Sequence, residues 1–158
     1  MTKALRPLIP ASSAALALVF LTGGCHPVYY PQQQQIQDAE ALIVLYVDGA
    51  DCKAELRPKL IFAETDHKVE WYVRNTCPGD PRTVRLENFN ITRKDGSKDK
   101  KHPFKEPEDK LKVTVGFGQK DKITAHIKSS SDFAGHYTYD AYNGNDPNPI
   151  DPDLEIWH

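Results

Sequence analysis

Apolar and polar side chains alternate with a period of two along most of the chain after residue 40. In the segment 67–75, Val69, Trp71 and Val73 alternate with polar or charged residues, which predicts a strand with one buried face and Trp71 in the core. The run 41–47 is apolar throughout, which predicts a strand covered on both faces or packed under a loop, closed by a turn at Asp48-Gly49. Further alternating segments lie at 84–86, 89–91, 111–117, 123–127, 137–141 and 154–156.

This pattern predicts an all-β fold of seven to eight short strands. Pro, Gly, Asp and Asn residues separate the segments, as expected of a Greek-key β-sandwich over residues 39–158. The alternation changes phase after Asn88, which predicts a bulge or bend there. No window of helical length carries a 3.6-residue apolar stripe, and Asp51–Leu56 is the best candidate for a single helical turn. The charged stretch Arg93–Lys110 predicts a solvated loop, and its lysines are candidates for contact with an acidic partner.

The first 25 residues have the pattern of an export signal. Lys3 and Arg6 precede an apolar run at 14–21 that is too short to span a bilayer permanently. The run ends in Leu21-Thr22-Gly23-Gly24-Cys25, which resembles the lipobox of bacterial lipoproteins. The resemblance implies cleavage before Cys25 and its modification with three acyl chains, palmitate among them, which exceeds what stable anchoring requires. Ordinary secretory cleavage beside an incidental cysteine is the alternative.

The segment after Cys25 is expected to be a tether. Residues 26–38 contain two prolines and a run of glutamines but no apolar periodicity, which is typical of a flexible linker. The expected organisation is a signal peptide at 1–24, a lipidated N-terminus and tether at 25–38, and one β-domain at 39–158. His26 stands where inner-membrane lipoproteins often have Asp, so the resemblance favours the outer membrane, facing the periplasm.

Charge narrows the range of partners. Without Lys3 and Arg6 the chain has 18 Lys and Arg against 22 Asp and Glu, a formal charge of −4. Such mild acidity gives no electrostatic attraction to nucleic acid.

The cysteine count predicts one disulfide. Once Cys25 carries lipid, Cys52 and Cys77 remain, 25 positions apart. In an oxidising periplasm they are expected to form a structural bond. On the loop-entropy model such a closure stabilises by roughly 3 to 4 kcal/mol.

Several segments together resemble a cupredoxin-like domain. They are Pro58-Lys59-Leu60-Ile61-Phe62, Val69-Glu70-Trp71 with Asn75, Val84-Arg85-Leu86, Gly135-His136-Tyr137-Thr138-Tyr139, and Pro152-Asp153-Leu154-Glu155-Ile156. The resemblance covers residues 41–157 and implies a cupredoxin-like sandwich, with an immunoglobulin-like sandwich as the alternative.

The resemblance does not extend to copper ligands. A blue-copper site needs two imidazoles and a thiolate, usually with an axial Met. The first imidazole would lie near Arg82 or Thr83 and the thiolate at Ala141, and the only Met is Met1. Type 1 copper is therefore not expected.

Two sets of side chains are candidates for another metal. His126 and His136 fall on adjacent predicted strands in an outward phase, where they could share an ion across the sheet surface. A second group concentrates oxygen donors that suit calcium, without the EF-hand spacing: Asp140, Asn143, Asn145 and Asp146. The alternatives are solvent-facing histidines and ordinary turn residues.

Nothing in the sequence supports catalysis. There is no Gly-x-Ser-x-Gly elbow, and no cofactor is expected. Tyr72, Tyr142 and Trp157 are candidates for a recognition surface. The expected function is that of a non-enzymatic lipoprotein, held in the membrane by its lipid, whose sandwich binds an envelope component or partner protein. The alternative is a periplasmic lipoprotein that binds copper, zinc or calcium through surface histidines or the Asp/Asn-rich loop.

Overall fold

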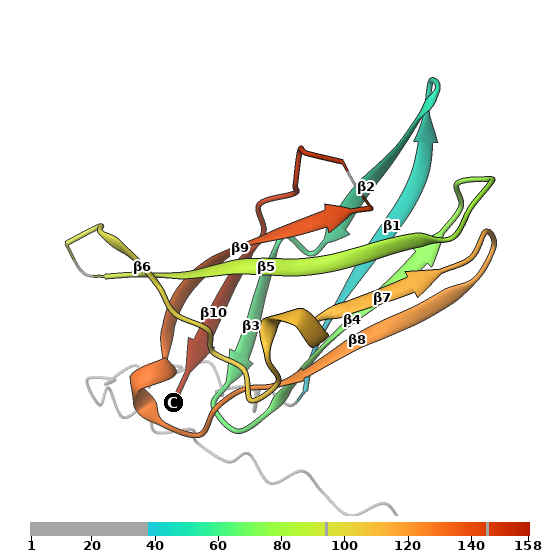
Figure 1. The fold of residues 1–158 in the computed structure, drawn as a ribbon. Helices are drawn as coiled ribbons and strands as arrows, with labels where there is room; N and C mark the ends of the chain where they lie inside the picture. Colours follow the sequence, from blue (N-terminus) through green and yellow to red (C-terminus); the bar gives the residue numbers. More distant parts are fainter. Residues whose placement is uncertain (1–37, 94, 145) are drawn as a thin grey trace, which may run out of the picture. The chain divides into compact units, whose positions relative to one another are not determined.

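Two β-sheets stacked face to face make up the part of the protein that the computed structural model describes, namely residues 38–93, 95–144 and 146–158 (Figure 1). The predicted signal peptide, Cys25, the predicted tether up to residue 37, and residues 94 and 145 lie outside these residues. Within them, no helix is long and apolar enough to cross a membrane.

The first sheet has the strand order β2-β1-β4-β8. Its strands are β1 (Ala39–Asp48), β2 (Asp51–Arg57), β4 (Lys68–Asn75) and β8 (Lys120–His126). Strand β1 runs parallel to β4, and the other neighbours are antiparallel.

The second sheet has the order β3-β10-β9-β5-β6, with β7 also paired to β5. Its strands are β3 (Leu60–Glu64), β5 (Arg82–Thr92), β6 (Lys98–Lys100), β7 (Lys112–Val115), β9 (Gly135–Asn143) and β10 (Asp153–Trp157). Short 3-10 turns span Glu108–Lys110 and Ser131–Phe133. The chain passes repeatedly from one sheet to the other, so the predicted all-β sandwich is confirmed.

Aromatic side chains fill the space between the sheets. Trp71 of β4 is fully buried and donates its indole N–H to the Tyr139 hydroxyl at 2.8 Å. The Tyr139 ring stacks on Phe89 with centroids 5.0 Å apart, and Phe104 meets Trp71 edge to face at 5.6 Å. This cluster joins both sheets across their centre, and the prediction that Trp71 lies in the core is confirmed.

The described residues form ten strands, more than the seven to eight expected. The segment Asp51–Leu56, considered for a helical turn, lies in β2. A two-residue turn at Gly49-Ala50 joins β1 to β2, and the antiparallel pairing starts with Asp48 opposite Asp51. Pairing in such a hairpin overrides a weak local preference for a helical turn. The expected irregularity after Asn88 is confirmed by a register shift between Glu87 and Asn90.

The run 41–47 is covered on one face only, contrary to the prediction. Ala41, Ile43 and Leu45 are buried, whereas Leu42 and Tyr46 are exposed. The outer face of the first sheet carries these apolar side chains because nothing else in the described residues packs over them.

Two further details differ from the sequence-based expectation. The Arg93–Lys110 stretch is not a wholly solvated loop, since it contains β6 and the fully buried Phe104. Phe117, expected on the same buried face as Leu111 and Val115, is 60% exposed because it lies in the turn between β7 and β8.

Candidate functional site

The predicted disulfide is present at one end of the sandwich. Cys52, at the start of β2, bonds to Cys77, just after β4, with their Cα atoms 5.8 Å apart. The bond links two strands that lie on either side of β1. We call this region, which also contains the start of β5 and the last residues of β9, the disulfide end.

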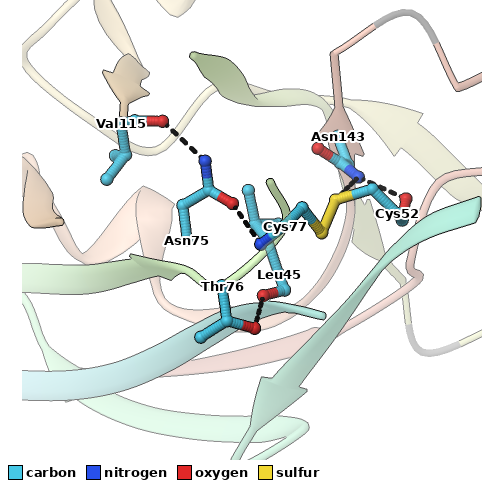
Figure 2. The surroundings of a disulfide bond; sticks show 7 residues. All are labelled: Leu45, Cys52, Asn75, Thr76, Cys77, Val115 and Asn143. Carbon is cyan, nitrogen blue, oxygen red and sulfur yellow. Dashed lines mark hydrogen bonds between the residues drawn. A yellow bond between two sulfur atoms is a disulfide. The ribbon is translucent and has the colours of Figure 1, made fainter. Parts of the chain in front are cut away.

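Hydrogen bonds from the last residue of β4 and the residue that follows it hold the disulfide end together (Figure 2). The Asn75 side chain accepts the Cys77 backbone N–H at 2.9 Å and donates to the Val115 carbonyl, in the second sheet, at 2.8 Å. The Thr76 hydroxyl donates to the Leu45 carbonyl at 2.6 Å. Since both sheets are tied to one short segment, the walls of this end are fixed relative to each other.

Asn143 extends this network from the second sheet. It follows Tyr139 and Ala141 in the inward phase of β9 and is only 6% exposed. Its amide nitrogen donates to the Cys52 carbonyl at 2.7 Å and lies 3.6 Å from the Cys52 sulfur. Figure 2 shows the amide oxygen turned away from Cys52. That oxygen is buried and accepts no hydrogen bond from the described residues.

A groove of about 850 Å³ opens beside Asn143. Its walls come from the β1–β2 turn and the start of β2, from the start of β5, and from the end of β9 with the loop that follows. The lining is mostly polar, and its charged members are Asp51, Lys53, Arg82, Arg85 and Asp146.

The three cations of the groove differ in their pairing. Lys53 forms an ion pair with Asp48, and this contact raises the Lys53 pKa. Arg85 lies 3.1 Å from a Glu87 oxygen, although its buried Nε–H makes no hydrogen bond within the described residues. Arg82 has no carboxylate within ion-pair distance among the described residues, and its buried Nε–H has no acceptor there. Of the three cations, Arg82 is therefore the one without an ion-pair partner in the described part of the chain.

Arg85 is also held on its outer side. Its guanidinium carbon lies 5.1 Å from the centre of the Tyr142 ring, which is within the range of a cation–π contact. The arginine therefore lies against the groove rim rather than extending freely into solvent.

The structure separates the two candidate histidines. His126 ends β8 in the first sheet, where its Nδ1 lies 2.6 Å from Glu106, and His136 lies on β9 in the second sheet. The prediction of adjacent strands is wrong because the chain changes sheets between them. His136 instead lies between Asp153, at 3.2 Å, and Glu155, at 3.1 Å.

The candidate oxygen donors do not converge either. The Asp140 side chain accepts hydrogen bonds from Asn88 at 2.7 Å and Tyr142 at 3.1 Å, and the Asp140 carboxyl raises the pKa of Asp151. Asn143 points inward, while Asp146 accepts the Asn148 backbone N–H at 2.9 Å, as an ordinary turn residue does.

No group of three or more His, Cys, Asp or Glu side chains in the described residues is arranged to hold a metal ion. At the positions where the cupredoxin resemblance places copper ligands, Arg82 supplies a guanidinium and Ala141 a methyl group. Neither group coordinates copper.

The three candidate recognition aromatics do not come together. Tyr72 is on the first sheet and Tyr142 on the second, and each donates a hydrogen bond to a neighbouring carboxylate. Trp157 is exposed at the end of β10. The sequence pointed to Asn143 only as a candidate calcium ligand and to Arg82 only as a position without a copper ligand. Their shared groove was not predicted, although a polar residue that continues an inward-facing apolar alternation is a usable signal for a partly buried polar site.

Comparisons with known proteins bear on the fold alone. No protein-family model matches the sequence, and no curated protein matches it. Among solved structures, a blue copper oxidase from Nitrosomonas europaea is 12% identical with a TM-score of 0.39, and the match covers 80% of this chain and 46% of that one. A multicopper oxidase that functions in iron import is 9% identical, also with a TM-score of 0.39, and the match covers 77% of this chain and 27% of that one.

A smaller neighbour is a mutant amicyanin with Cu(I), 12% identical with a TM-score of 0.31, for which 73% of this chain and 81% of that one are covered. The chain thus spans less than half the length of the two oxidases named above. The fold class itself rests on the two sheets described above.

Proposed function

We propose that the protein is a lipid-anchored envelope protein of the outer membrane whose non-catalytic β-sandwich binds an extended segment of a partner protein at edge strand β3. The anchor in this proposal is Cys25, because residues 21–25 resemble a lipobox. Binding at β3 is inferred from the exposed side chains and the free backbone groups of that strand.

The observation that carries the proposal is an exposed apolar patch beside a free sheet edge. Leu60 and Phe62 of β3 are 38% and 45% exposed, and Trp157 of β10 is 46% exposed. The Phe62 and Trp157 rings meet edge to face with centroids 6.2 Å apart. Exposed apolar side chains that cluster in this way mark interaction surfaces more often than isolated ones do.

The backbone of β3 adds hydrogen-bonding capacity to this patch. In the described part of the chain β3 pairs only with β10, and the pairing is parallel. The Asp153 N–H donates to the Lys59 carbonyl and the Thr65 N–H to the Trp157 carbonyl, each at 2.8 Å. Because a parallel strand directs alternate residues to each side, residues 59, 61, 63 and 65 face β10, whereas Leu60 and Phe62 direct their backbone groups to the free edge.

A free edge of this kind selects an extended partner. An added strand would take up the N–H and C=O groups of Leu60 and Phe62, and its own alternate side chains would contact the apolar patch. The expected partner segment therefore has apolar residues at every second position.

The first step of the test is photocrosslinking in cells that produce the protein. A photoreactive phenylalanine analogue is placed at position 62, and the same analogue at position 117 provides a matched control, since Phe117 is more exposed and lies in the β7–β8 turn. We expect a discrete adduct from position 62 only, from which the partner is identified.

The second step measures affinity for the identified partner with purified variants. Leu60→Pro removes one N–H that faces the free edge and leaves the pairing with β10 intact. Leu60→Pro and Phe62→Asp are each expected to weaken binding by about tenfold or more, whereas Phe117→Asp is expected to have no effect. Equal adducts at both positions, or unchanged affinity in both β3 variants, would refute the proposal.

A further inference from the structure

The groove at the disulfide end is a second surface with features of a binding site. Its volume of about 850 Å³ lies within the range of small-molecule sites. The disulfide to Cys77 holds Cys52 of the β2 wall, and the hydrogen bond from Asn143 to the Cys52 carbonyl joins that wall to the end of β9. Because its walls belong to β2, β5 and β9, it is distinct from the β3 edge.

Arg82 supplies an unpaired hydrogen-bond donor with a positive charge. It shares the inward phase of Val84 and Leu86 on β5, so it lies at the mouth between the two sheets. Its Nε–H is buried without an acceptor among the described residues, and a buried polar group without a partner costs free energy. A guanidinium in this state fits a carboxylate or phosphate, which accepts two parallel N–H bonds.

Asn143 supplies an unpaired acceptor in the same groove. The contact from its amide nitrogen to Cys52 fixes the orientation of the amide, so its carbonyl oxygen cannot exchange places with the nitrogen. That oxygen is buried and receives no hydrogen bond from the described residues. It requires a donor such as a hydroxyl group.

Among the charged side chains of the groove, Arg82 is the one that would attract an anion most strongly. Lys53 and Arg85 lie beside Asp48 and Glu87, and Asp146 accepts hydrogen bonds from Asn148. Asp51 is the one other acid in the lining. Three cations against two acids give the lining a small positive excess, and Arg82 is the cation without an ion-pair partner in the described residues.

We propose that the groove binds a small hydroxylated organic anion, such as a sugar acid or a sugar phosphate. The anionic group lies on Arg82, and a hydroxyl of the same molecule donates to the Asn143 carbonyl oxygen. Carboxylate and phosphate share the recognition chemistry, so the choice between them is an outcome of the test.

The test is an NMR titration of the full mature chain in detergent micelles, read from backbone amides and the Arg82 Nε–H. The probes are glucuronate and glucose 1-phosphate, with glucose as the uncharged control and acetate and sulfate as anions without hydroxyls. We expect saturable shifts at Arg82, Asn143 and Cys52 with at least one of the two hydroxylated anions. The three controls are expected to bind about tenfold more weakly or not at all.

Variants localise the binding. Arg82→Gln is expected to weaken it by about tenfold or more, and Arg82→Lys to recover part of the loss by retaining the charge. Arg74→Gln, at an exposed arginine of β4, serves as the matched control and is expected to have no effect. The proposal fails if neither hydroxylated anion shifts the groove residues, if Arg82→Gln binds as well as the parent protein, or if glucose, acetate or sulfate binds equally well.

Discussion

Glu70 is an outward-facing carboxylate of β4 that its neighbours almost entirely cover, leaving the residue 4% exposed. It accepts hydrogen bonds from the Lys122 ammonium at 2.7 Å, the Tyr72 hydroxyl at 2.9 Å and the Lys68 ammonium at 3.3 Å. We expect Glu70→Gln to destabilise the fold, because it leaves the ammonium groups of Lys122 and Lys68 facing a neutral amide.

The expected loss of unfolding free energy follows from the pKa of the Glu70 carboxyl. The hydrogen bonds from Lys122 and then Tyr72 lower the pKa of Glu70 from 4.5 to about 2. A difference of roughly 2.5 in pKa corresponds to about 3 kcal/mol. The Lys122 and Lys68 side chains are 45% and 34% exposed, so solvent screens both pairs and we expect the loss to be about 1 to 2 kcal/mol.

The lowered pKa of Glu70 also determines how its contribution to stability depends on pH. Because the folded-state pKa of Glu70 is depressed, its contribution is fully present above pH 4.5 and is lost as the pH falls towards 2. The difference in unfolding free energy between the parent protein and Glu70→Gln is therefore expected to shrink across that interval.

The assay is urea unfolding, followed by tryptophan fluorescence at about pH 7 and about pH 3. Asp80→Asn is the matched control, since Asp80 is exposed in the β4–β5 connection and its change is expected to cost less than about 0.5 kcal/mol. A Glu70→Gln loss of the same size at both pH values, or no larger than that of Asp80→Asn at neutral pH, would refute the reasoning.

Three further predictions concern the disulfide, the core and the anchor. Replacing both Cys52 and Cys77 by Ala is expected to cost about 3.5 kcal/mol in urea unfolding on the loop-entropy model; an unchanged midpoint would contradict it. Tyr139→Phe leaves the buried Trp71 N–H without its acceptor and is expected to cost about 1 to 2 kcal/mol, measured by thermal unfolding; Tyr46→Phe, at an exposed tyrosine, serves as its near-neutral control. Cys25→Ser is expected to abolish incorporation of labelled palmitate and release the protein from membrane fractions, while persistent labelling would show that lipid is attached elsewhere.

Much of the fold could be predicted from local pattern. Val69, Trp71 and Val73 alternate with polar residues, and the structure buries them as that period requires. The phase change after Asn88 likewise corresponds to the observed shift in register. These features are accessible because strand side chains point to alternate faces whatever the partner strand is.

The candidate sites were harder to predict because they depend on which strands meet. The histidines at 126 and 136 are close in sequence, yet the chain changes sheets between them. Glu70 follows the outward phase but is covered by side chains from β8 and β4 itself. Periodicity assigns a face and does not report what lies over that face.

By itself, the sequence determined the all-β class and most core positions, because each depends on side-chain period or on composition. Only the tertiary structure decided the placement of Arg82 and Asn143 in one groove, since their strands pair through a register that starts at Val84 opposite Asn143. It also decided that β3 lies at the edge of its sheet within the described residues, because that depends on the order of all the strands in the sheet. Such long-range pairing is selected by the whole core and is not encoded in any short segment.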